Sequence, residues 1–117
     1  MIDDAAVSSM KKGVILINAA RGQLFDLDAV IRGMESGRIG GAAMDVIEGE
    51  ELVRDTYETG ECLHPQLKKL LEFPTFTYTQ HTAFFTDEAF RDMTRTCLQN
   101  LIDYNRTGTC ARELVKE

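Results

Sequence analysis

The chain has 117 residues, of which 44% are hydrophobic and 27% charged, and its formal net charge at pH 7 is −6. This length fits one domain at most, and the mixture of apolar and charged residues excludes collagen-like, low-complexity and disordered chains. The acidic balance disfavours a nucleic-acid partner, and no apolar stretch approaches the roughly 20 residues that a membrane span needs.

The three cysteines, Cys62, Cys97 and Cys110, are odd in number and widely spaced, which fits a reducing compartment better than a disulfide framework. The acidic first residues also lack the basic-then-apolar order of a signal peptide, so we expect a cytoplasmic protein. Cys62 and His64 could share a metal ion, but no second pair of ligands stands close to them. We expect no metal site, and a polar surface loop over residues 52–65.

The opening of the chain predicts a short helix, because Asp3 can cap its N-terminus and Gly13 suits the left-handed residue that follows a helix. Residues 14–17 are then four branched apolar residues in a row. A run without alternation is typical of a strand covered on both faces, as in a parallel sheet. This strand ends in a polar turn that contains Arg21.

A second helix is expected over residues 27–36, with Asp26 as its N-cap. A second strand is expected from Ile39 to Val46, and it leads into an acidic segment that contains Glu50. Residues 66–72 predict a further short helix.

Residues 76–79 predict a third strand, which runs into His81. The last and longest helix is expected over residues 87–105, capped by Thr86. Its apolar residues recur at three or four positions and predict a buried stripe made of Phe90, Met93, Cys97, Leu101 and Tyr104.

Helices that alternate with strands predict an α/β fold, with a parallel sheet of about three strands and flanking helices. The carboxyl ends of parallel strands share one edge of the sheet, and ligands bind in the crevice beyond that edge. Arg21 follows the first strand, Asp45 and Glu50 follow the second, and His81 follows the third. Each strand is therefore expected to deliver ionisable groups to one rim.

These residue types form a coherent chemical set. A carboxylate beside a histidine fixes the tautomer of the ring and stabilises its protonated form, which suits general acid–base catalysis. An arginine can bind a substrate carboxylate through two hydrogen bonds and polarise a carbonyl. Each residue also has a non-functional explanation: a surface ion pair for Arg21, a solvated carboxylate for Glu50 and loop hydrogen bonds for His81. A pair such as Phe84 and Phe85 is more often part of a core than the wall of a substrate pocket.

Four stretches carry a resemblance to a known family: residues 10–22, residues 35–46, and the motifs Glu48-Gly49-Glu50 and His81-Thr82-Ala83-Phe84-Phe85-Thr86. Together they resemble the D-isomer-specific 2-hydroxyacid dehydrogenases. The last two motifs look like the D-lactate dehydrogenase branch, including the VanH-type enzymes of vancomycin resistance, more than phosphoglycerate dehydrogenase. The similarity runs in order along nearly the whole chain.

The resemblance implies a partial Rossmann-like domain, with residues 1–105 as the C-terminal part of an NAD-binding domain and 106–117 as a tail. It implies hydride transfer between NAD and a small 2-oxo or 2-hydroxy acid. Arg21 would orient the acid, His81 would donate the proton and Glu50 would hold His81. The implied nicotinamide contacts are Ala19, Ala20, Arg21, Asp45 and His81, with Asp45 at the carboxamide, and Phe84 and Phe85 would line the side-chain pocket.

Two departures from the family pattern have consequences. Gln80 stands where the family usually has a proline, which bears on the placement of His81. The chain also has no GxGxxG motif, the turn that approaches the pyrophosphate. We therefore expect half a dinucleotide domain that either self-associates as a homo-oligomer or is an incomplete copy of a longer protein. We expect that alone it neither binds NADH tightly nor reduces pyruvate. The alternative is a non-catalytic dehydrogenase remnant that acts as an oligomerisation or protein-interaction module.

Overall fold

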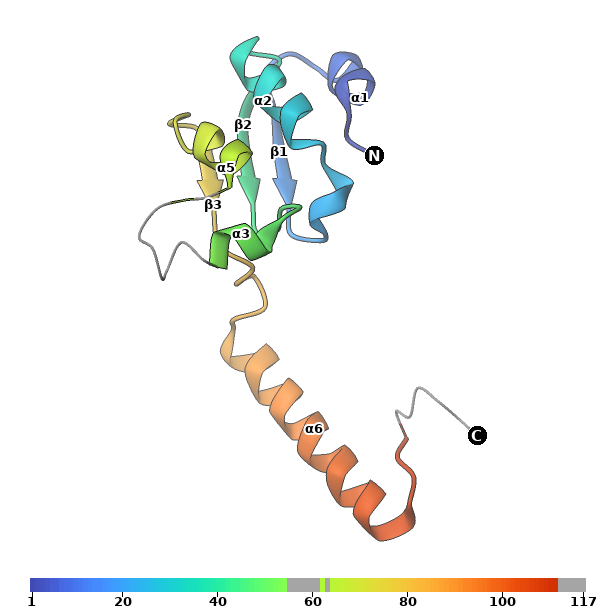
Figure 1. Cartoon of the computed structure of the whole chain (residues 1–117). Coiled ribbons are helices and arrows are strands. Elements are labelled where there is room, and N and C mark those ends of the chain that lie inside the picture. Colours follow the sequence, from blue (N-terminus) through green and yellow to red (C-terminus); the bar gives the residue numbers. More distant parts are fainter. Residues whose placement is uncertain (55–61, 63, 112–117) are drawn as a thin grey trace. The chain divides into compact units, whose positions relative to one another are not determined.

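The computed structural model describes residues 1–54, 62 and 64–111. The chain divides into two compact units, Met1–Ala83 and Phe84–Glu117. The first unit contains the sheet and the shorter helices, and the second contains one long helix (Figure 1).

The first unit is built on a parallel sheet of three strands in the order β1-β2-β3. The strands are β1 (Val14–Asn18), β2 (Ile39–Met44) and β3 (Phe76–Tyr78). Their last residues are register partners, since Asn18 pairs with Met44 and Met44 pairs with Tyr78. The predicted α/β fold with about three parallel strands is confirmed, and the three strands end side by side.

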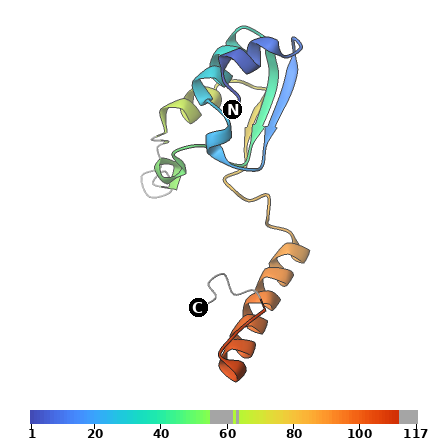
Figure 2. The same ribbon diagram turned by 90° about the vertical axis from the view of Figure 1, so that its right-hand side faces the viewer.

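Five helical segments accompany this sheet: α1 (Asp4–Ser9), the 3-10 turn η1 (Gly22–Leu24), α2 (Leu27–Glu35), α3 (Glu50–Arg54) and α5 (Pro65–Leu70). The two expected aspartate caps are present. Asp3 accepts a hydrogen bond from the N–H of Ala6 at 2.9 Å, and Asp26 accepts one from Ala29 at 3.1 Å. The helices α1, α2 and α5 lie over the same face of the sheet (Figure 2).

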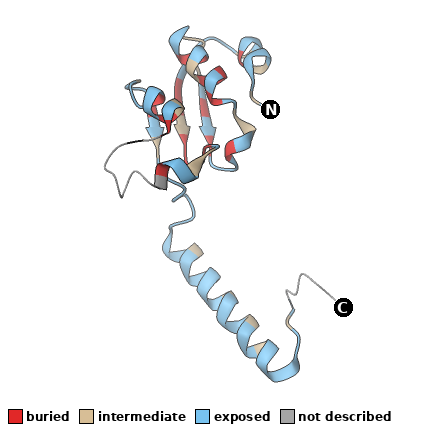
Figure 3. Cartoon of the chain, viewed as in Figure 1, coloured by how far each residue is buried: buried red, intermediate tan, exposed pale blue. Residues whose placement is uncertain are grey.

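The core lies between these helices and the sheet (Figure 3). Its buried apolar side chains are Val7, Leu16, Leu27, Val30, Met34, Ile39, Ala42, Met44, Ile47, Val53, Leu67, Leu70 and Phe76. The prediction that the first strand is covered on both faces is wrong for this chain. Leu16 and Asn18 are buried, whereas Ile15 and Ile17 are 71% and 72% exposed, because the described helices cover only one face.

The prediction of a polar surface loop over residues 52–65 is wrong at both ends and falls outside the described residues in its centre, 55–61 and 63. The segment begins within α3, whose Val53 is buried. It ends at His64, which is 3% exposed and caps α5 by accepting a hydrogen bond from the N–H of Leu67. This capping bond and burial under the Glu48 turn place the histidine inside the unit.

The second unit contains α6 (Asp87–Thr107), which begins at the expected cap, Thr86, and ends at Gly108 in the left-handed conformation. The predicted buried stripe is wrong in this chain, because no residue of α6 is buried. Large apolar side chains are exposed along it: Phe90, Met93, Leu98, Leu101, Ile102 and Tyr104. Neither α6 nor any other helix among the described residues has the length and apolar character needed to cross a membrane.

Candidate active site

The residues that follow the three aligned strand ends surround one cavity. Arg21 comes three residues after the end of β1, Glu50 opens α3 beyond β2, and His81 follows β3. All three side chains line a cavity of about 190 Å³, together with Gly22, Gln23, Val46, Ile47, Gly49 and Glu51. The structure thus brings the predicted arginine, carboxylate and histidine to one place, within the first unit.

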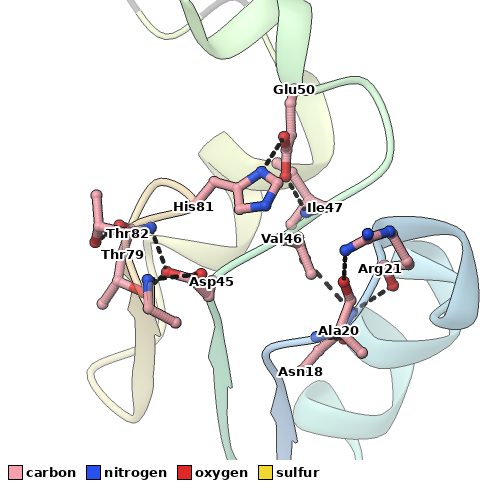
Figure 4. A network of polar contacts seen from close by, with 11 residues as sticks. Asn18, Ala20, Arg21, Asp45, Val46, Ile47, Glu50, Thr79, His81 and Thr82 are labelled. Carbon is pink, nitrogen blue, oxygen red and sulfur yellow. Dashed lines mark hydrogen bonds and ion pairs between the residues drawn. The ribbon is translucent and has the colours of Figure 1, made fainter. Parts of the chain in front are cut away.

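His81 and Glu50 form a direct pair in this cavity (Figure 4). The ring Nδ1 of His81 lies 3.0 Å from Oε2 of Glu50, and the other carboxylate oxygen, Oε1, accepts the N–H of Ile47 at 3.2 Å. A carboxylate oxygen can only accept, so Nδ1 carries the proton. The second ring nitrogen, Nε2, makes no hydrogen bond to any residue of the described chain, which leaves it able to exchange a proton with a ligand.

The loop that carries Arg21 is held by the side chain of Asn18. The amide nitrogen of Asn18 donates to the carbonyl of Arg21 at 3.0 Å and to that of Val46 at 3.4 Å, and its oxygen accepts the N–H of Ala20 at 3.2 Å. Nη1 of Arg21 donates to the carbonyl of Ala20 at 2.7 Å. Within the described residues no carboxylate pairs with this guanidinium, and Arg21 is one of the residues that line the cavity.

Asp45 follows β2 directly, and its side chain is turned toward the loop that carries His81 (Figure 4). Its carboxylate accepts hydrogen bonds from the hydroxyl of Thr79 at 2.5 Å and from the N–H groups of Thr82 at 2.8 Å and Ala83 at 3.0 Å. Burial raises the pKa of Asp45, but the hydrogen bonds from Thr79, Ala83 and Thr82, with the nearby His81, outweigh it and hold the pKa below its ordinary value.

The remaining predicted site residues do not line this cavity. Ala19 and Ala20 are exposed beyond the end of β1. Phe84 and Phe85 belong to the second unit, where they are 50% and 72% exposed and contact each other edge to face with their ring centroids 6.3 Å apart. Their exposure does not support a core role in this chain.

A comparison with protein families matches residues 1–83 to the D-isomer specific 2-hydroxyacid dehydrogenase, NAD binding domain. This range is the first compact unit and contains the whole cavity. The chain belongs to the D-isomer-specific 2-hydroxyacid dehydrogenase family.

Individual relatives agree with this family. The chain is 40% identical over 116 residues to an aromatic 2-oxoacid reductase of Clostridium sporogenes, covering 98% of this chain and 35% of the relative. Among solved structures, a D-lactate dehydrogenase from Sporolactobacillus matches with a TM-score of 0.90 and 36% identity, over 98% of this chain and 35% of that one. An NAD-complexed 2-hydroxyacid dehydrogenase from Lactobacillus delbrueckii matches with a TM-score of 0.85, 33% identity and coverage of 98% and 35%.

The chain therefore spans about a third of the length of the relatives that it matches. The family match and the NAD-complexed relative identify NAD as the cofactor of this domain. The residues present fit its nicotinamide end. Ala19 and Ala20 place only methyl groups beyond β1, and Oδ2 of Asp45 accepts a single hydrogen bond, so it can accept another from an amide.

Asn18 and Thr79 organise this part of the domain and were not predicted from the sequence, and His64 was considered only as a metal ligand. Asn18 and Thr79 follow or end a strand, as hydrogen-bonding residues at a sheet edge often do, but their partners lie up to 34 positions away in the chain. His64 uses Nδ1 to accept from Leu67, and Nε2 donates to the carbonyl of Glu48 at 2.7 Å. Both nitrogens of His64 are therefore occupied, and no group of three or more metal-binding side chains gathers among the described residues.

Proposed function

We propose that this chain provides the catalytic rim of an NAD-dependent D-2-hydroxyacid dehydrogenase, similar to D-lactate dehydrogenase, that interconverts a 2-oxo acid and a D-2-hydroxy acid. The observation that carries the proposal is the convergence of Arg21, Glu50 and His81 on one cavity. In this reaction NADH, when bound, supplies the hydride. The residues of the chain bind the acid and supply the proton.

Arg21 binds and polarises the substrate in this proposal. Its guanidinium has no carboxylate partner among the described residues, and its backbone is fixed by Asn18. A planar guanidinium matches a carboxylate through two parallel hydrogen bonds and remains charged at any physiological pH. The same group can donate to the neighbouring carbonyl oxygen, on which negative charge develops as the 2-oxo acid is reduced.

His81 holds the proton that the product hydroxyl gains. Glu50 accepts a hydrogen bond from Nδ1, so the proton that is transferred sits on Nε2, the nitrogen without a partner in the described part of the chain. Transfer of that proton to the carbonyl oxygen completes the hydroxyl group, and the reverse transfer initiates oxidation of the hydroxy acid. Glu50 itself stays anchored through the N–H of Ile47.

The site favours a small acid. A cavity of about 190 Å³ is smaller than the roughly 300–1,000 Å³ of sites for drug-sized ligands. The relatives act by name on lactate and on aromatic 2-oxo acids. Phe84 and Phe85 are apolar and exposed, and we assign them to the wall that receives the substrate side chain. Asp45, Ala19 and Ala20 are assigned to the nicotinamide, and the free cysteines fit a cytoplasmic location.

The test uses the chain alone and a chimera in which it replaces the aligned third of the Sporolactobacillus D-lactate dehydrogenase. We expect the isolated 117-residue chain to show no tight binding of NADH by fluorescence and no reduction of pyruvate, since it spans a third of its relatives. The chimera should reduce pyruvate to D-lactate.

Matched variants give the chimera experiment its controls. Arg21→Lys keeps the charge but removes the fork and should lower kcat/KM, and His81→Gln should lower kcat/KM by about 10²–10⁴-fold while leaving a measurable rate. Glu51→Gln is the control for Glu50→Gln, because Glu51 lines the same cavity without bonding to His81. A chimera that folds and binds NADH but does not reduce any 2-oxo acid would reject the proposal.

A second candidate function is a non-catalytic module for self-association. Two exposed apolar surfaces favour it: Ile15 and Ile17 on the open face of the sheet, and the apolar side chains of α6. Such surfaces are uncommon on monomeric proteins and often mark interfaces. Sedimentation velocity of the purified chain would detect a homo-oligomer. A monodisperse monomer would reject self-association, whatever the activity of the chimera.

A further inference from the structure

The turn that presents His81 has an unusual backbone. Gln80 and His81 have φ angles of 56° and 58°, and they are the only non-glycine residues with positive φ in the described part of the chain. The left-handed region is disfavoured for residues that carry a Cβ atom. Proline, whose φ is fixed near −65°, could not occupy position 80 in this turn. Two consecutive residues in this region persist only where their surroundings hold them.

The groups that hold this turn converge on one side chain. The hydroxyl of Thr79, immediately before the turn, and the N–H groups of Thr82 and Ala83, immediately after it, all donate to the carboxylate of Asp45. The N–H of His81 donates to the backbone carbonyl of Asp45 at 2.6 Å. Asp45 is buried, and its carboxylate binds the turn both before and after the two left-handed residues (Figure 4).

We propose that Asp45 is a positioning residue, whose carboxylate holds Gln80 and His81 in the left-handed conformation and so keeps Nδ1 of His81 on Glu50. Its value for catalysis rests on the proposed function, but the geometric claim does not. Contact with a nicotinamide amide is compatible with this role, because Oδ2 accepts only one of the three bonds.

The tautomer of His81 reports this positioning directly. With Nδ1–H bound to Glu50, the neutral ring carries its proton on Nδ1. A neutral histidine without such a partner favours the Nε2–H form. The chain has only two histidines, and the other, His64, is held as the Nε2–H tautomer by Glu48 and Leu67. The two rings are therefore expected to be in opposite tautomers.

The experiment is a ¹⁵N NMR measurement of both imidazoles in the 117-residue chain, about two pH units above the ordinary histidine pKa of about 6.5. His81→Gln assigns the signals. In the wild-type chain we expect mainly Nδ1–H at His81 and Nε2–H at His64. In Asp45→Asn the NH₂ group replaces one carboxylate oxygen and cannot accept a hydrogen bond, so either the N–H of Ala83 or the hydroxyl of Thr79 loses its acceptor. We therefore expect the Nδ1–H to Nε2–H ratio of His81 to fall severalfold while His64 is unchanged.

Two further variants keep the test sharp. Asp26→Asn is the matched control, because Asp26 also accepts two backbone N–H groups and asparagine caps helices equally well, so His81 should not respond. Gln80→Gly, added to Asp45→Asn, removes the Cβ penalty at position 80 and should restore part of the Nδ1–H population. If Asp45→Asn does not fold, Thr79→Val removes one of the three bonds and should cause a smaller shift in the same direction.

A wild-type His81 in the Nε2–H form, or an unchanged His81 tautomer in folded Asp45→Asn, would overturn the positioning role. Because the measurement needs neither cofactor nor substrate, failure of the proposed dehydrogenase activity would leave its outcome unaffected. Conversely, an active chimera would not rescue the positioning role if Asp45→Asn left the ring tautomer as it was.

Discussion

Gly22 lies where the loop that carries Arg21 meets the segment that leads to Glu50, and its replacement by alanine tests how closely the two halves of the site pack. A Cβ atom at position 22 would lie 2.2 Å from the carbonyl carbon of Ile47, 2.3 Å from its oxygen and 2.4 Å from the nitrogen of Glu48. Carbon atoms in contact ordinarily lie about 3.5–4.0 Å apart. The two backbones must therefore separate by more than about 1 Å, and no flexible side chain can absorb the shift.

The expected destabilisation of Gly22→Ala is about 3 kcal/mol, at the upper end of the usual cost of overpacking. With a urea m-value of about 2 kcal/mol/M, the unfolding midpoint should fall by about 1.5 M. The NMR signals of the Asn18 side-chain amide should shift as well, because this group bridges the carbonyls of Arg21 and Val46 across the same contact.

Gly37→Ala is the matched control for this prediction. Gly37 has a φ of +67°, but no atom lies within 4 Å of the added Cβ, so the substitution carries only the left-handed penalty of about 1–2 kcal/mol. It should leave the Asn18 signals in place. The close packing of the two loops would be refuted if Gly22→Ala cost no more than Gly37→Ala and left the Asn18 amide unshifted.

Three further predictions concern the core, α6 and the response to acid. Leu70 is fully buried, and Leu70→Ala should lower the free energy of unfolding in urea by about 2–5 kcal/mol. Leu71 is 54% exposed, and Leu71→Ala should lower it by less than about 0.5 kcal/mol. Equal losses would show that the core does not lie around Leu70. Thr86→Ala should weaken α6 by about 1 kcal/mol and lower the helical ellipticity, because the cap on the N–H of Ala89 is lost. Thr86→Ser keeps the hydroxyl and should keep the ellipticity of the wild-type chain. The pKa of Asp45 is lowered, so its carboxylate stabilises the fold above the unfolded aspartate pKa of about 3.9, and this contribution is lost as pH falls through the lower folded pKa. Amide exchange at Thr82, corrected for its intrinsic rate, should accelerate only in that acidic range, and an unchanged pH profile in Asp45→Asn would contradict this.

Much of the site could be predicted because topology does most of the placement. Parallel strands end on one edge, so residues that follow them meet there, and Arg21, Glu50 and His81 could be brought together from their order in the sequence alone. The caps Asp3 and Asp26 act within their own helices, so their role was readable from local sequence.

The errors arose where structure depends on distant partners. The apolar run of β1 indicates a strand covered on both faces, but the described helices cover one face, which leaves Ile15 and Ile17 exposed. His64 is buried through bonds to Glu48 and Leu67 rather than through an apolar pattern. The cap on Leu67 is local, but the bond to Glu48 spans 16 positions and could not be read from the local sequence.

The orientation of His81 was beyond sequence reasoning for the same reason. Its left-handed backbone is held by Asp45, 36 positions earlier in the chain, and neither Gln80 nor His81 favours that conformation alone. The absence of proline at position 80 departs from the family pattern, and the structure explains it, since φ at Gln80 is 56° and proline cannot adopt that angle.

The most direct test of the central claim, that Glu50 and His81 act as one unit on the substrate of Arg21, is a double-mutant cycle in the chimeric dehydrogenase. Pyruvate reduction would be measured for Glu50→Gln, His81→Gln and the double variant. If the pair acts together, the double variant loses no more kcat/KM than His81→Gln alone. Losses that multiply would show that the two side chains act independently, and the paired mechanism would be wrong.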